Sequence, residues 1–468
     1  MLEVVGDLSS SARLPVTRAT QTGRVTSNSS SYSFDGIITA DDPALTLETR
    51  NGELHFTKRV DSNEAICTMQ VEENTLYYDS LSAALADLPS DDNVITLLKN
   101  FDLGAQVSVP ANSGAATITS AGNEDDTPIV ITWENATASF FNVPSDAELT
   151  VSGNIVICGS ESNGQRAFDV AGTLNFGEAS SVSQYPMVEQ FDLSTSRGIA
   201  AVYVNGGTLN LYSGTLSQNK GYYGGAVSVR YNGNAKLFGG TISDNTAPSG
   251  GGLYVANSTV TLSGTKISEN SAKQGGGIYN QHGIVTIEQG EISGNWVDGE
   301  NLKENPNGGG IYNDNTGTVT MNGGKINGNA VKVHVNVYGR GRGAAVCNNG
   351  KFTITAGEVS GNYCEQGDSI TETTMYCAGL YNEKQMEIAG GTISNNFYTF
   401  SSTLNNHECF AGVGVSNNGG TLTITGGTIT GNGIRSEDPS GIGIAGAGVA
   451  STANSANNAV FNMTGGTI

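Results

Sequence analysis

The chain is dominated by short alternations of apolar and polar residues, and Gly or Asn closes each alternation. Residues 275–295 show the pattern best, with apolar positions at Ile278, Val285, Ile287 and Ile292. A period of two is typical of strands, and the glycines mark sharp corners. Three such strands per unit, each of three to five residues, predict a three-sided coil whose turns stack at ~4.8 Å as parallel sheets. The sequence therefore predicts an all-β fold, a parallel β-helix with three sheets.

One asparagine closes the third run of each unit. These residues are Asn219, Asn245, Asn270, Asn295, Asn329, Asn362, Asn396 and Asn432. They are 25 or 26 residues apart at first and 33 to 36 residues apart later. A regular period of this size indicates a solenoid. Amides that stack in register can hydrogen-bond along the axis and satisfy buried turn backbone, so we expect an asparagine ladder at this corner.

The chain divides into four parts, and three of them lie in the N-terminal quarter. Residues 1–32 are expected to be a disordered Ser/Thr-rich tail, and residues 33–73 a small β segment with a hairpin at Asn51-Gly52. Residues 74–98 contain a predicted helix over 79–88 and a first strand. Asp79 or Ser80 is the expected N-cap, and the helix is expected to cap the solenoid end, which would otherwise expose unpaired backbone. The β-helix is expected to fill residues 99–468, with an inserted loop at 183–196.

The later units are longer because each carries an insertion after the ladder asparagine. The insertions are 296–307, 330–342, 363–377, 397–411 and 433–445. They all leave from one corner, so we expect them to lie side by side on one edge, as binding loops of repeat proteins do. Their candidate ligand-binding residues are Trp296, Tyr338, Arg340, Arg342, Tyr363, Tyr376, Phe397, Tyr398, Phe400 and Phe410. The competing interpretation is that these rings pack the loops against the coil and against each other.

The repeat wording resembles a known family. GGTISDN at 239–245, GGTISNN at 390–396, GGTITGN at 426–432 and GGGIYN at 275–280 resemble the GGTISGN and GGGIYN repeats of bacterial surface proteins regarded as adhesins. The similarity to polymorphic outer-membrane protein repeats is lower, because the FxxN motif of that family is irregular here. The resemblance covers about residues 200–468, and it implies a right-handed parallel β-helix on a bacterial surface. Repeats of this kind determine shape rather than chemistry.

Composition and charge exclude some classes of binding partner. The formal net charge of −22, with only 22 Lys and Arg residues, argues against nucleic acid and anionic membranes as partners. No apolar run reaches the ~18 residues of a membrane helix, and the first residues lack the pattern of a signal peptide. We expect a secreted or cell-surface fragment whose signal and anchor lie outside it.

Six cysteines are present, and four of them fall in the C-terminal third. Cys347, Cys364, Cys377 and Cys409 are therefore disulfide candidates in an oxidising compartment. Cys364 with Cys377 would close one insertion at its base, and Cys377 with Cys409 is the rival pairing. CxxC pairs and clustered histidines are absent from the sequence, so we predict no metal and no cofactor.

An enzyme on this fold would need grouped carboxylates. A polysaccharide lyase would need them for Ca²⁺ beside an Arg or Lys base, and a glycoside hydrolase would need two at ~5–9 Å. The outward columns carry mainly Thr, Asn, Ser and Tyr, as at Tyr279, Tyr312 and Tyr381. The sequence therefore favours a non-catalytic, adhesin-like stalk that binds a surface glycan or protein through its insertions. A carbohydrate-active enzyme is the alternative.

Overall fold

The structure is a computed structural model of the 468-residue chain. It describes residues 14–16, 23–24, 38–40, 45–50, 53–58, 60–71, 74–88, 93–111, 115–121, 127–134, 136–159, 164–179, 183–194, 199–298, 305–333, 341–366, 376, 379–400, 407–409, 412–435, 442–444, 446–454 and 456–468.

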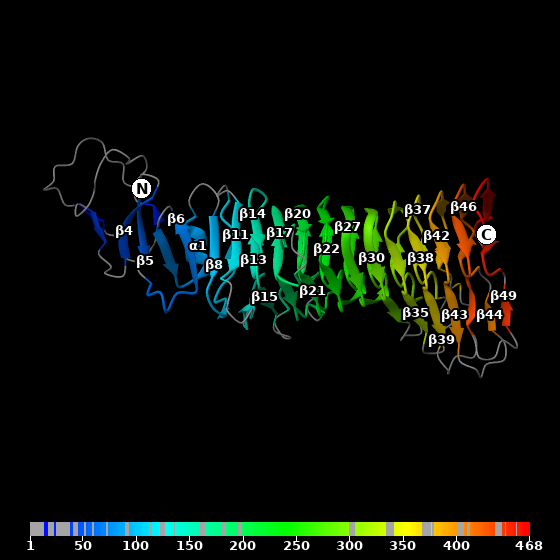
Figure 1. Cartoon of the computed structure of the whole chain (residues 1–468), viewed down its shortest axis with the longest axis horizontal. Coiled ribbons are helices and arrows are strands. Elements are labelled where there is room, and N and C mark those ends of the chain that lie inside the picture. The colour runs from blue at the N-terminus through cyan, green and yellow to red at the C-terminus, as the bar shows by residue number, and fades with distance from the viewer. Residues whose placement is uncertain are drawn as a thin grey trace.

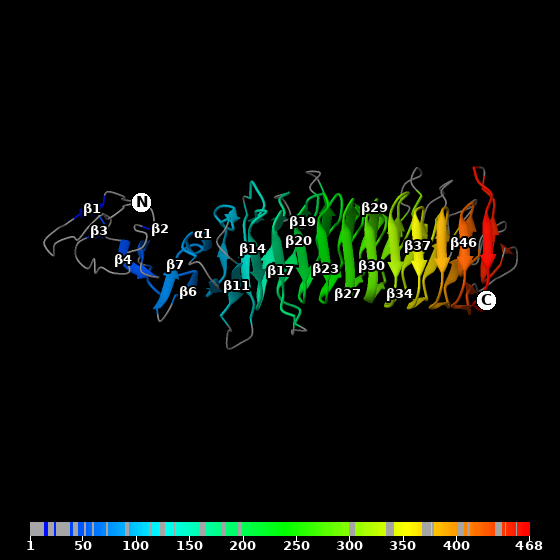
Figure 2. The ribbon, with the colours of Figure 1, turned by 90° about the horizontal axis from the view of Figure 1, so that it is seen from above.

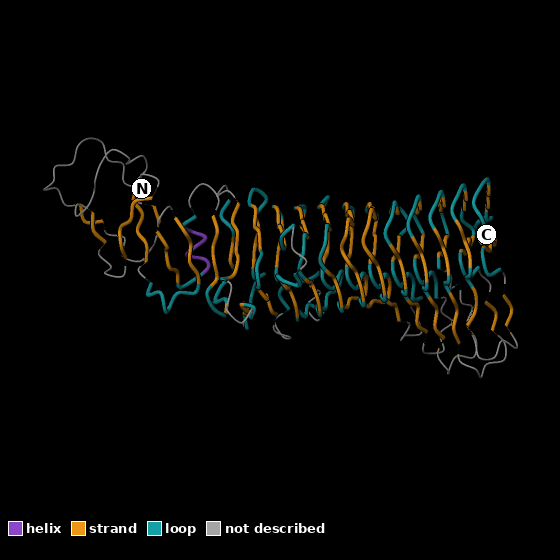
Figure 3. Tube along the Cα trace, in the orientation of Figure 1, coloured by secondary structure: helices purple, strands orange, loops and turns teal. Residues whose placement is uncertain are grey.

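The molecule is an elongated rod of stacked strands (Figure 1). The N-terminus and the C-terminus lie at opposite ends, and Figure 2 shows the same stacking from above. Figure 3 separates the strands from the turns that connect them and places helix α1 (Leu81–Ala86) near the N-terminal end. This is the shape expected of a parallel β-helix.

Within the described residues, the strands of the rod form three large sheets. The first has 12 strands: β10 (Val107–Ser108), β13 (Phe141–Val143), β16 (Phe168–Val170), β19 (Val202–Asn205), β22 (Val227–Arg230), β26 (Leu253–Ala256), β29 (Ile278–Gln281), β32 (Ile311–Asn313), β36 (Val346–Asn348), β40 (Leu380–Asn382), β45 (Val415–Asn418) and β50 (Val449–Thr452). Its strands pair in parallel and in register, one from each coil, as at Ile278 with Ile311.

The second sheet has 25 strands and takes two from each coil. It comprises β6 (Cys67–Val71), β7 (Asn74–Tyr78), β8 (Asn93–Leu97), β9 (Phe101–Asp102), β11 (Ala115–Ser120), β12 (Ile129–Thr132), β14 (Glu148–Val151), β15 (Ile155–Cys158), β17 (Thr173–Phe176), β18 (Met187–Glu189), β20 (Thr208–Leu211), β21 (Thr215–Ser217), β23 (Asn234–Leu237), β24 (Thr241–Ser243), β27 (Thr259–Ser268), β30 (Ile284–Ser293), β33 (Thr318–Met321), β34 (Lys325–Asn327), β37 (Lys351–Ile354), β38 (Glu358–Ser360), β41 (Gln385–Ile388), β42 (Thr392–Ser394), β46 (Thr421–Ile424), β47 (Thr428–Thr430) and β51 (Val460–Met463). The ten-residue strands β27 and β30 run through both columns and join them.

The third sheet has seven parallel strands, which follow the ladder corners from Asn245 to Asn432. It comprises β25 (Thr246–Ser249), β28 (Ser271–Gln274), β31 (Trp296–Asp298), β35 (Ala330–Val333), β39 (Tyr363–Gln366), β43 (Phe397–Phe400) and β48 (Gly433–Arg435). The three-sheet parallel β-helix predicted from the sequence is confirmed.

The period of two also gives the inward positions correctly. Ile278, Val285, Ile287 and Ile292 are all fully buried. They belong to one apolar cluster that runs the length of the solenoid from Cys67 to Ile429. Each coil buries only a few branched side chains, so stability accumulates through contacts between neighbouring coils.

The predicted asparagine ladder is present at the expected corner. Each amide nitrogen donates to the amide oxygen of the next coil, from Asn219 to Asn245 at 3.0 Å through to Asn396 to Asn432 at 2.9 Å. The backbone N–H of each asparagine donates to the same oxygen, as from Asn295 to Asn329 Oδ1 at 3.0 Å. All eight side chains are buried. The ladder satisfies turn backbone that has no access to water.

A second ladder was not predicted. Asn280, Asn313, Asn348, Asn382 and Asn417 are fully buried on the inward side of the 12-stranded sheet. Their amides also bond from coil to coil, at 2.7–2.8 Å. In the preceding coils the same register position holds valine, the last of them Val255. The second ladder therefore begins abruptly at Asn280.

The N-terminal helix caps the solenoid end as expected, but it is shorter than predicted. Ser80 is the N-cap, and its Oγ accepts from Ala83 N at 3.3 Å. Leu81, Ala84 and Leu85 are buried in the solenoid core, and α1 packs against β6, β7 and β10. The hairpin β6–β7 adds an antiparallel partner to β8, and α1 packs against β10, the terminal strand of the 12-stranded sheet.

The predicted hairpin at Asn51-Gly52 is also confirmed, since β4 (Leu45–Arg50) and β5 (Glu53–Lys58) pair antiparallel across these two residues. Two pieces of the expected tail are strands instead. β1 (Leu14–Val16) pairs with β3 (Ile38–Ala40), and β2 (Gly23–Arg24) pairs with β5. The other residues of 1–32 lie outside the described residues.

The expected inserted loop at 183–196 is wrong in its middle. Met187–Glu189 forms β18, which pairs in parallel with β15 and β21. Val188, Phe191 and Leu193 are buried in the core. A three-residue strand that follows Pro186 shows too little alternation to be recognised from the sequence.

The insertions do not begin as loops. Their first residues are the strands β31, β35, β39, β43 and β48 of the seven-stranded sheet. The segments that lead back from this sheet to the solenoid pair with one another. Asn307, Arg342 and Tyr376 form isolated bridges, and β44 (His407–Cys409) and β49 (Ile442–Ile444) form a two-stranded sheet. We call the seven-stranded sheet and these returning segments the fin. It lies below the C-terminal half of the rod in the view of Figure 1.

Candidate functional site

Three of the expected binding residues form one column on the fin. Trp296, Tyr363 and Phe397 share a register position of the seven-stranded sheet, with Ala330 between the first two. All three rings are half-buried. The Tyr363 and Phe397 rings stack with centroids 5.3 Å apart and planes inclined by 7°. The structure therefore brings these three residues together, as the sequence indicates.

The faces of these rings are largely occupied within the protein. Lys332 Nζ lies 5.2 Å from the Trp296 ring, and the Arg435 guanidinium lies 3.8 Å from the Phe397 ring. Cations over ring faces are attracted by the ring quadrupole. Ligands therefore meet mainly ring edges at this column.

Beside the aromatic column runs a column of charges. Asp298, Lys332, Glu365, Thr399 and Arg435 are successive register partners, so the charges of the first three alternate in sign. Opposite charges on neighbouring strands stabilise a sheet, and like charges would repel. The exposed face of the fin is thus a stack of rings next to a stack of alternating charges.

Tyr398 lies on the opposite face of the same sheet and is buried, which is a correction to its proposed contact role. It packs with Val297, Val331 and Cys364 in an apolar cluster separate from that of the solenoid. The fin therefore has a small core of its own. Tyr338, Arg340 and Phe410 lie outside the described residues, as does the side chain of Phe400.

The candidate disulfide cysteines also lie in different parts of the structure. Cys364 is disulfide-bonded, as its place in the fin core allows. Cys347, another candidate, is a free and fully buried thiol on the 12-stranded sheet, so its expected disulfide is wrong. The residue packs between Tyr312 and Tyr381 and faces away from the fin core. The side chains of Cys377 and Cys409 lie outside the described residues.

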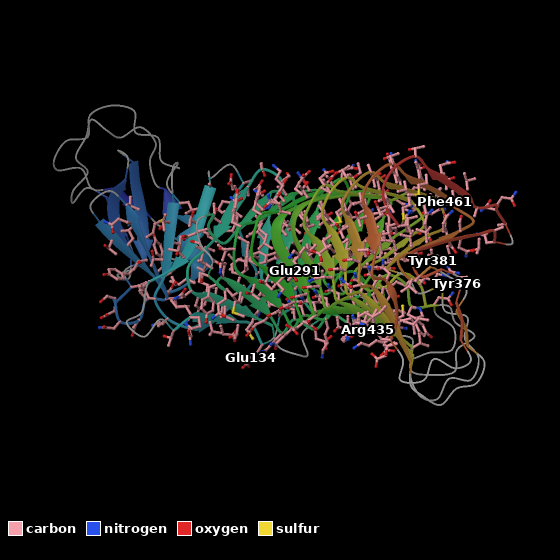
Figure 4. All side chains as sticks on the ribbon, turned by 45° about the vertical axis from the view of Figure 1, so that its right-hand side comes forward. Glu134, Glu291, Tyr376, Tyr381, Arg435 and Phe461 are labelled. Carbon is pink, nitrogen blue, oxygen red and sulfur yellow. The ribbon has the colours of Figure 1, made fainter. Side chains whose placement is uncertain are left out.

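Arg342 and Tyr376 lie apart from the aromatic column, where the fin returns to the solenoid. The Tyr376 ring lies 6.0 Å from the Tyr381 ring, and Figure 4 shows the two residues close together. The Arg342 guanidinium lies 5.3 Å from the Tyr381 ring. These two candidates belong to a second constellation, on the outward face of the 12-stranded sheet.

The outward face carries a column of tyrosines. Tyr254, Tyr279, Tyr312, Cys347 and Tyr381 are successive register partners. Neighbouring rings pack with centroids 4.9–5.4 Å apart. The sequence identified three of these tyrosines as outward, and the structure adds Tyr254 to the column.

The tyrosine hydroxyls hold a row of polar side chains. The row is Gln281, Asp314, Asn349, Glu383 and Asn418, each of which directly follows an asparagine of the second ladder. We call it the polar row. Each tyrosine bonds to the row residue of the next coil.

The partners in these bonds follow one pattern. The hydroxyl of Tyr254 donates to Gln281, and that of Tyr279 donates to Asp314. Tyr312 bonds to Asn349 at 3.1 Å.

Cys347 interrupts this pattern because it has no hydroxyl to offer Glu383. Arg342 from the fin supplies the missing donor, with Nη1 3.2 Å from Glu383 Oε1. The Tyr381 hydroxyl donates to the same oxygen at 2.7 Å and accepts from Asn418 Nδ2 at 2.7 Å. The Asn349 amide donates to Glu383 Oε2 at 3.1 Å, because a carboxylate accepts hydrogen bonds only. Glu383 is therefore fixed by three partners.

Burial sets the protonation of this constellation. It raises the pKa values of the Tyr279, Tyr312 and Tyr381 hydroxyls, with neighbouring acids adding to the effect at each. Burial lowers the pKa of Arg342, but Tyr381 and Glu383 outweigh it and the net pKa is raised. The tyrosines thus remain hydrogen-bond donors, and the arginine remains a cation, at all physiological pH values.

The signal for the polar row was present in the sequence. A Tyr-Asn pair precedes the row residue at Gln281, Asp314 and Glu383. Each pair spans the outward and the inward position of one strand. Recurrence of the pair at the solenoid period would have identified both the column and the second ladder.

A further carboxylate occupies the N-terminal part of the same outward face. Asp169 is the register partner of Tyr203 and pairs with Arg166 at 3.2 Å. Burial raises the pKa of Asp169, although Arg166 and Asn205 partly oppose it.

We expect Asp169→Asn to raise the melting temperature at pH 7. The folded pKa lies above its ordinary value of 3.8, so ionised Asp169 disfavours folding at neutral pH, whereas Asn mimics the protonated acid. The penalty is fully present above the folded pKa and disappears below the unfolded one. Melting curves of both proteins across pH 3–8 should converge at the acid end. A variant less stable than the parent at pH 7 would contradict this assignment.

In the part of the chain that the structure describes, no three His, Cys, Asp or Glu side chains are grouped so that they could hold a metal ion. No helix among the described residues is long and apolar enough to cross a bilayer.

Comparisons with protein-family models, with curated proteins and with solved structures find no match to this chain.

Proposed function

We propose that the protein is a secreted or cell-surface stalk that binds a surface glycan or protein through its fin, without catalysis. The observation that carries the proposal is the fin itself. Coils from β10 to β19 stack without a strand of the seven-stranded sheet, and the described residues form only isolated bridges there, at Asp192, Lys220 and Tyr223, so the solenoid does not need this layer to fold. A layer with its own apolar core, attached to one half of a rod, is best explained as a presented surface.

The chemistry of the fin face supports recognition. Aromatic and arginine side chains dominate the binding energy of many interfaces. Trp296, Tyr363, Phe397 and Arg435 share one face, with an alternating row of charges beside them. The resemblance of the repeat sequences to those of adhesin-like proteins agrees with this proposal.

The alternative, a carbohydrate-active enzyme, has one specific observation behind it. Asp314 and Glu383 occupy the polar row two coils apart, which corresponds to about 9.6 Å at the usual strand spacing. Glycosidase carboxylates lie ~5–9.5 Å apart. Both carboxylates are engaged, however, Asp314 by the Tyr279 hydroxyl and Glu383 by Arg342. We therefore rank this function second.

The variants Trp296→Ala and Tyr363→Ala test whether the fin is the binding surface. The measurement is the binding of fluorescently labelled protein to cells. We expect each variant to lose about tenfold in affinity, as hot-spot residues do on truncation. Phe238→Ala is the matched control, because Phe238 is a 43% exposed ring stacked on Tyr212 on the solenoid, and its variant should bind like the parent. Equal binding by all four proteins would exclude the fin face.

A further inference from the structure

The polar row is half-exposed except at Asn418, which is buried, and the tyrosines beneath the row are mostly buried. The Glu383 side chain is 25% exposed and the Arg342 side chain is 15% exposed. Asp314, Asn349 and Gln281 are also half-buried. The second ladder fixes the backbone beneath the row, and the tyrosine hydroxyls fix its side chains. The row is therefore a preorganised surface of hydrogen-bonding groups, which lowers the entropy lost when a ligand binds.

The row has unused hydrogen-bonding capacity. A carboxylate offers about four lone-pair positions. Glu383 uses three of them on Arg342, Tyr381 and Asn349. Arg342 Nε has no hydrogen-bond partner among the described residues, but this atom is buried and does not add to the capacity that a ligand can reach. The row contains carboxylates, which accept, and side-chain amides, which also donate, and hydroxyl groups can satisfy both because they donate and accept.

The regular spacing of the polar row favours a polymeric ligand with repeating units. Equivalent polar groups recur once per coil, at ~4.8 Å along the rod axis. An extended peptide strand is a poor match, because β29, β32 and β36 are hydrogen-bonded on both sides and offer no free edge to it. A chain of sugar units needs no backbone edge and carries hydroxyls at regular intervals.

The charge of the protein narrows the class of ligand that the polar row can bind. The chain has a net charge of −22, and the row contains Asp314 and Glu383. Arg342 is already paired with Glu383, and the Lys384 ammonium beside the row donates to Asn315 Oδ1 at 3.0 Å. A polyanionic ligand would be repelled, and the row is suited to a neutral one.

We infer that the polar row binds a neutral polysaccharide laid along the rod axis at the base of the fin, with Asp314, Asn349, Glu383 and Arg342 as its contacts. The inference rests on the proposed binding function and names the ligand class. Arg342 and Tyr376 come from the fin, so the fin forms one border of this site.

The experiment uses the 468-residue chain and an array of neutral plant and microbial polysaccharides, followed by calorimetry with the strongest binder. Asp314→Ala and Glu383→Gln should each weaken binding by about tenfold or more, because each removes hydrogen bonds to a charged group. Glu387→Gln is the matched control. Glu387 is half-buried on β41 of the 25-stranded sheet, away from the polar row, and its variant also loses one negative charge. Asn349→Ala tests the row without any change of charge. Melting temperatures establish that all variants fold.

Two outcomes would overturn the inference. One is a parent protein that binds no neutral polysaccharide, and the other is a set of row variants that bind as well as Glu387→Gln. Cell binding separates this failure from that of the proposed function. Binding that needs Trp296 but is unaffected in the row variants, and is lost when the cells are treated with protease, would refute the saccharide site and leave the fin as a protein-binding surface.

Discussion

Replacing Asn295 with Ala is expected to lower the free energy of unfolding by about 3 kcal/mol. Its amide nitrogen donates to Ile267 O and to Asn329 Oδ1, both at 2.9 Å. Its amide oxygen accepts from the backbone N–H and the side-chain amide of Asn270. The residue is fully buried, so water cannot replace these partners. Urea denaturation followed by circular dichroism measures the loss.

Asn234→Ala is the control for the ladder. Asn234 lies half-buried at the start of β23, away from the ladder corner, and its loss should change stability by less than about 0.5 kcal/mol. Hydrogen exchange adds a local measurement, because each coil depends mainly on its neighbours. Faster exchange should appear at the coils of Asn270 and Asn329 first. If Asn295→Ala unfolds at the same urea concentration as Asn234→Ala, the ladder is not stabilising.

Replacing Gly308 with Ala is expected to cost about 3 kcal/mol or more. Gly308 begins the glycine-rich corner before β32 and has a φ of +69°. A Cβ there would lie 2.3 Å from the carbonyl oxygen of Ile311, a backbone atom that cannot move without breaking the corner. Left-handed strain and a backbone clash therefore act together. The expected result is a large drop in melting temperature.

Gly328 provides a matched control, since it also has a positive φ, +61°. A Cβ at Gly328 would meet its nearest atom at 3.9 Å. Equivalent corners in other coils hold Asp244, Glu269 and Asn395, all with positive φ. Gly328→Asn should therefore leave the melting temperature within a few degrees of the parent. Similar losses at both glycines would mean that φ, and not the contact with Ile311, decides the effect.

The fold could be predicted because its determinants are local and repeated. Inward residues such as Ile287 recur at a period of two, and the ladder asparagines recur at one corner. The second ladder was missed because its position holds Val229 and Val255 in earlier coils, so the asparagine column starts only halfway along the chain. A prediction based on residues common to all coils cannot detect a column that changes its chemistry.

The candidate site was predicted less well than the fold. Trp296, Tyr363 and Phe397 were correctly grouped, because insertions from one corner must stack. The strands of the fin were missed because three residues, as in Trp296–Asp298, show too little alternation. The polar row was missed because most of its residues bond to a tyrosine of the preceding coil, as Gln281 does to Tyr254 and Asn418 to Tyr381, and sequence spacing alone does not show which coils are in register.

The two ladders give the rod an electrical direction. Every bond from one ladder amide to the next donates toward the C-terminal end, and this orientation is fixed because the backbone N–H of each first-ladder asparagine requires an oxygen of the next coil. Amide dipoles that point the same way add, as peptide dipoles do in a helix, and hydrogen bonds in such a chain polarise one another. The C-terminal end of both ladders therefore carries partial positive charge and the opposite end partial negative charge. A rod with a net charge of −22 thus contains two aligned columns of dipoles, which favour an anionic group at the C-terminal end of the solenoid over one at its N-terminal end.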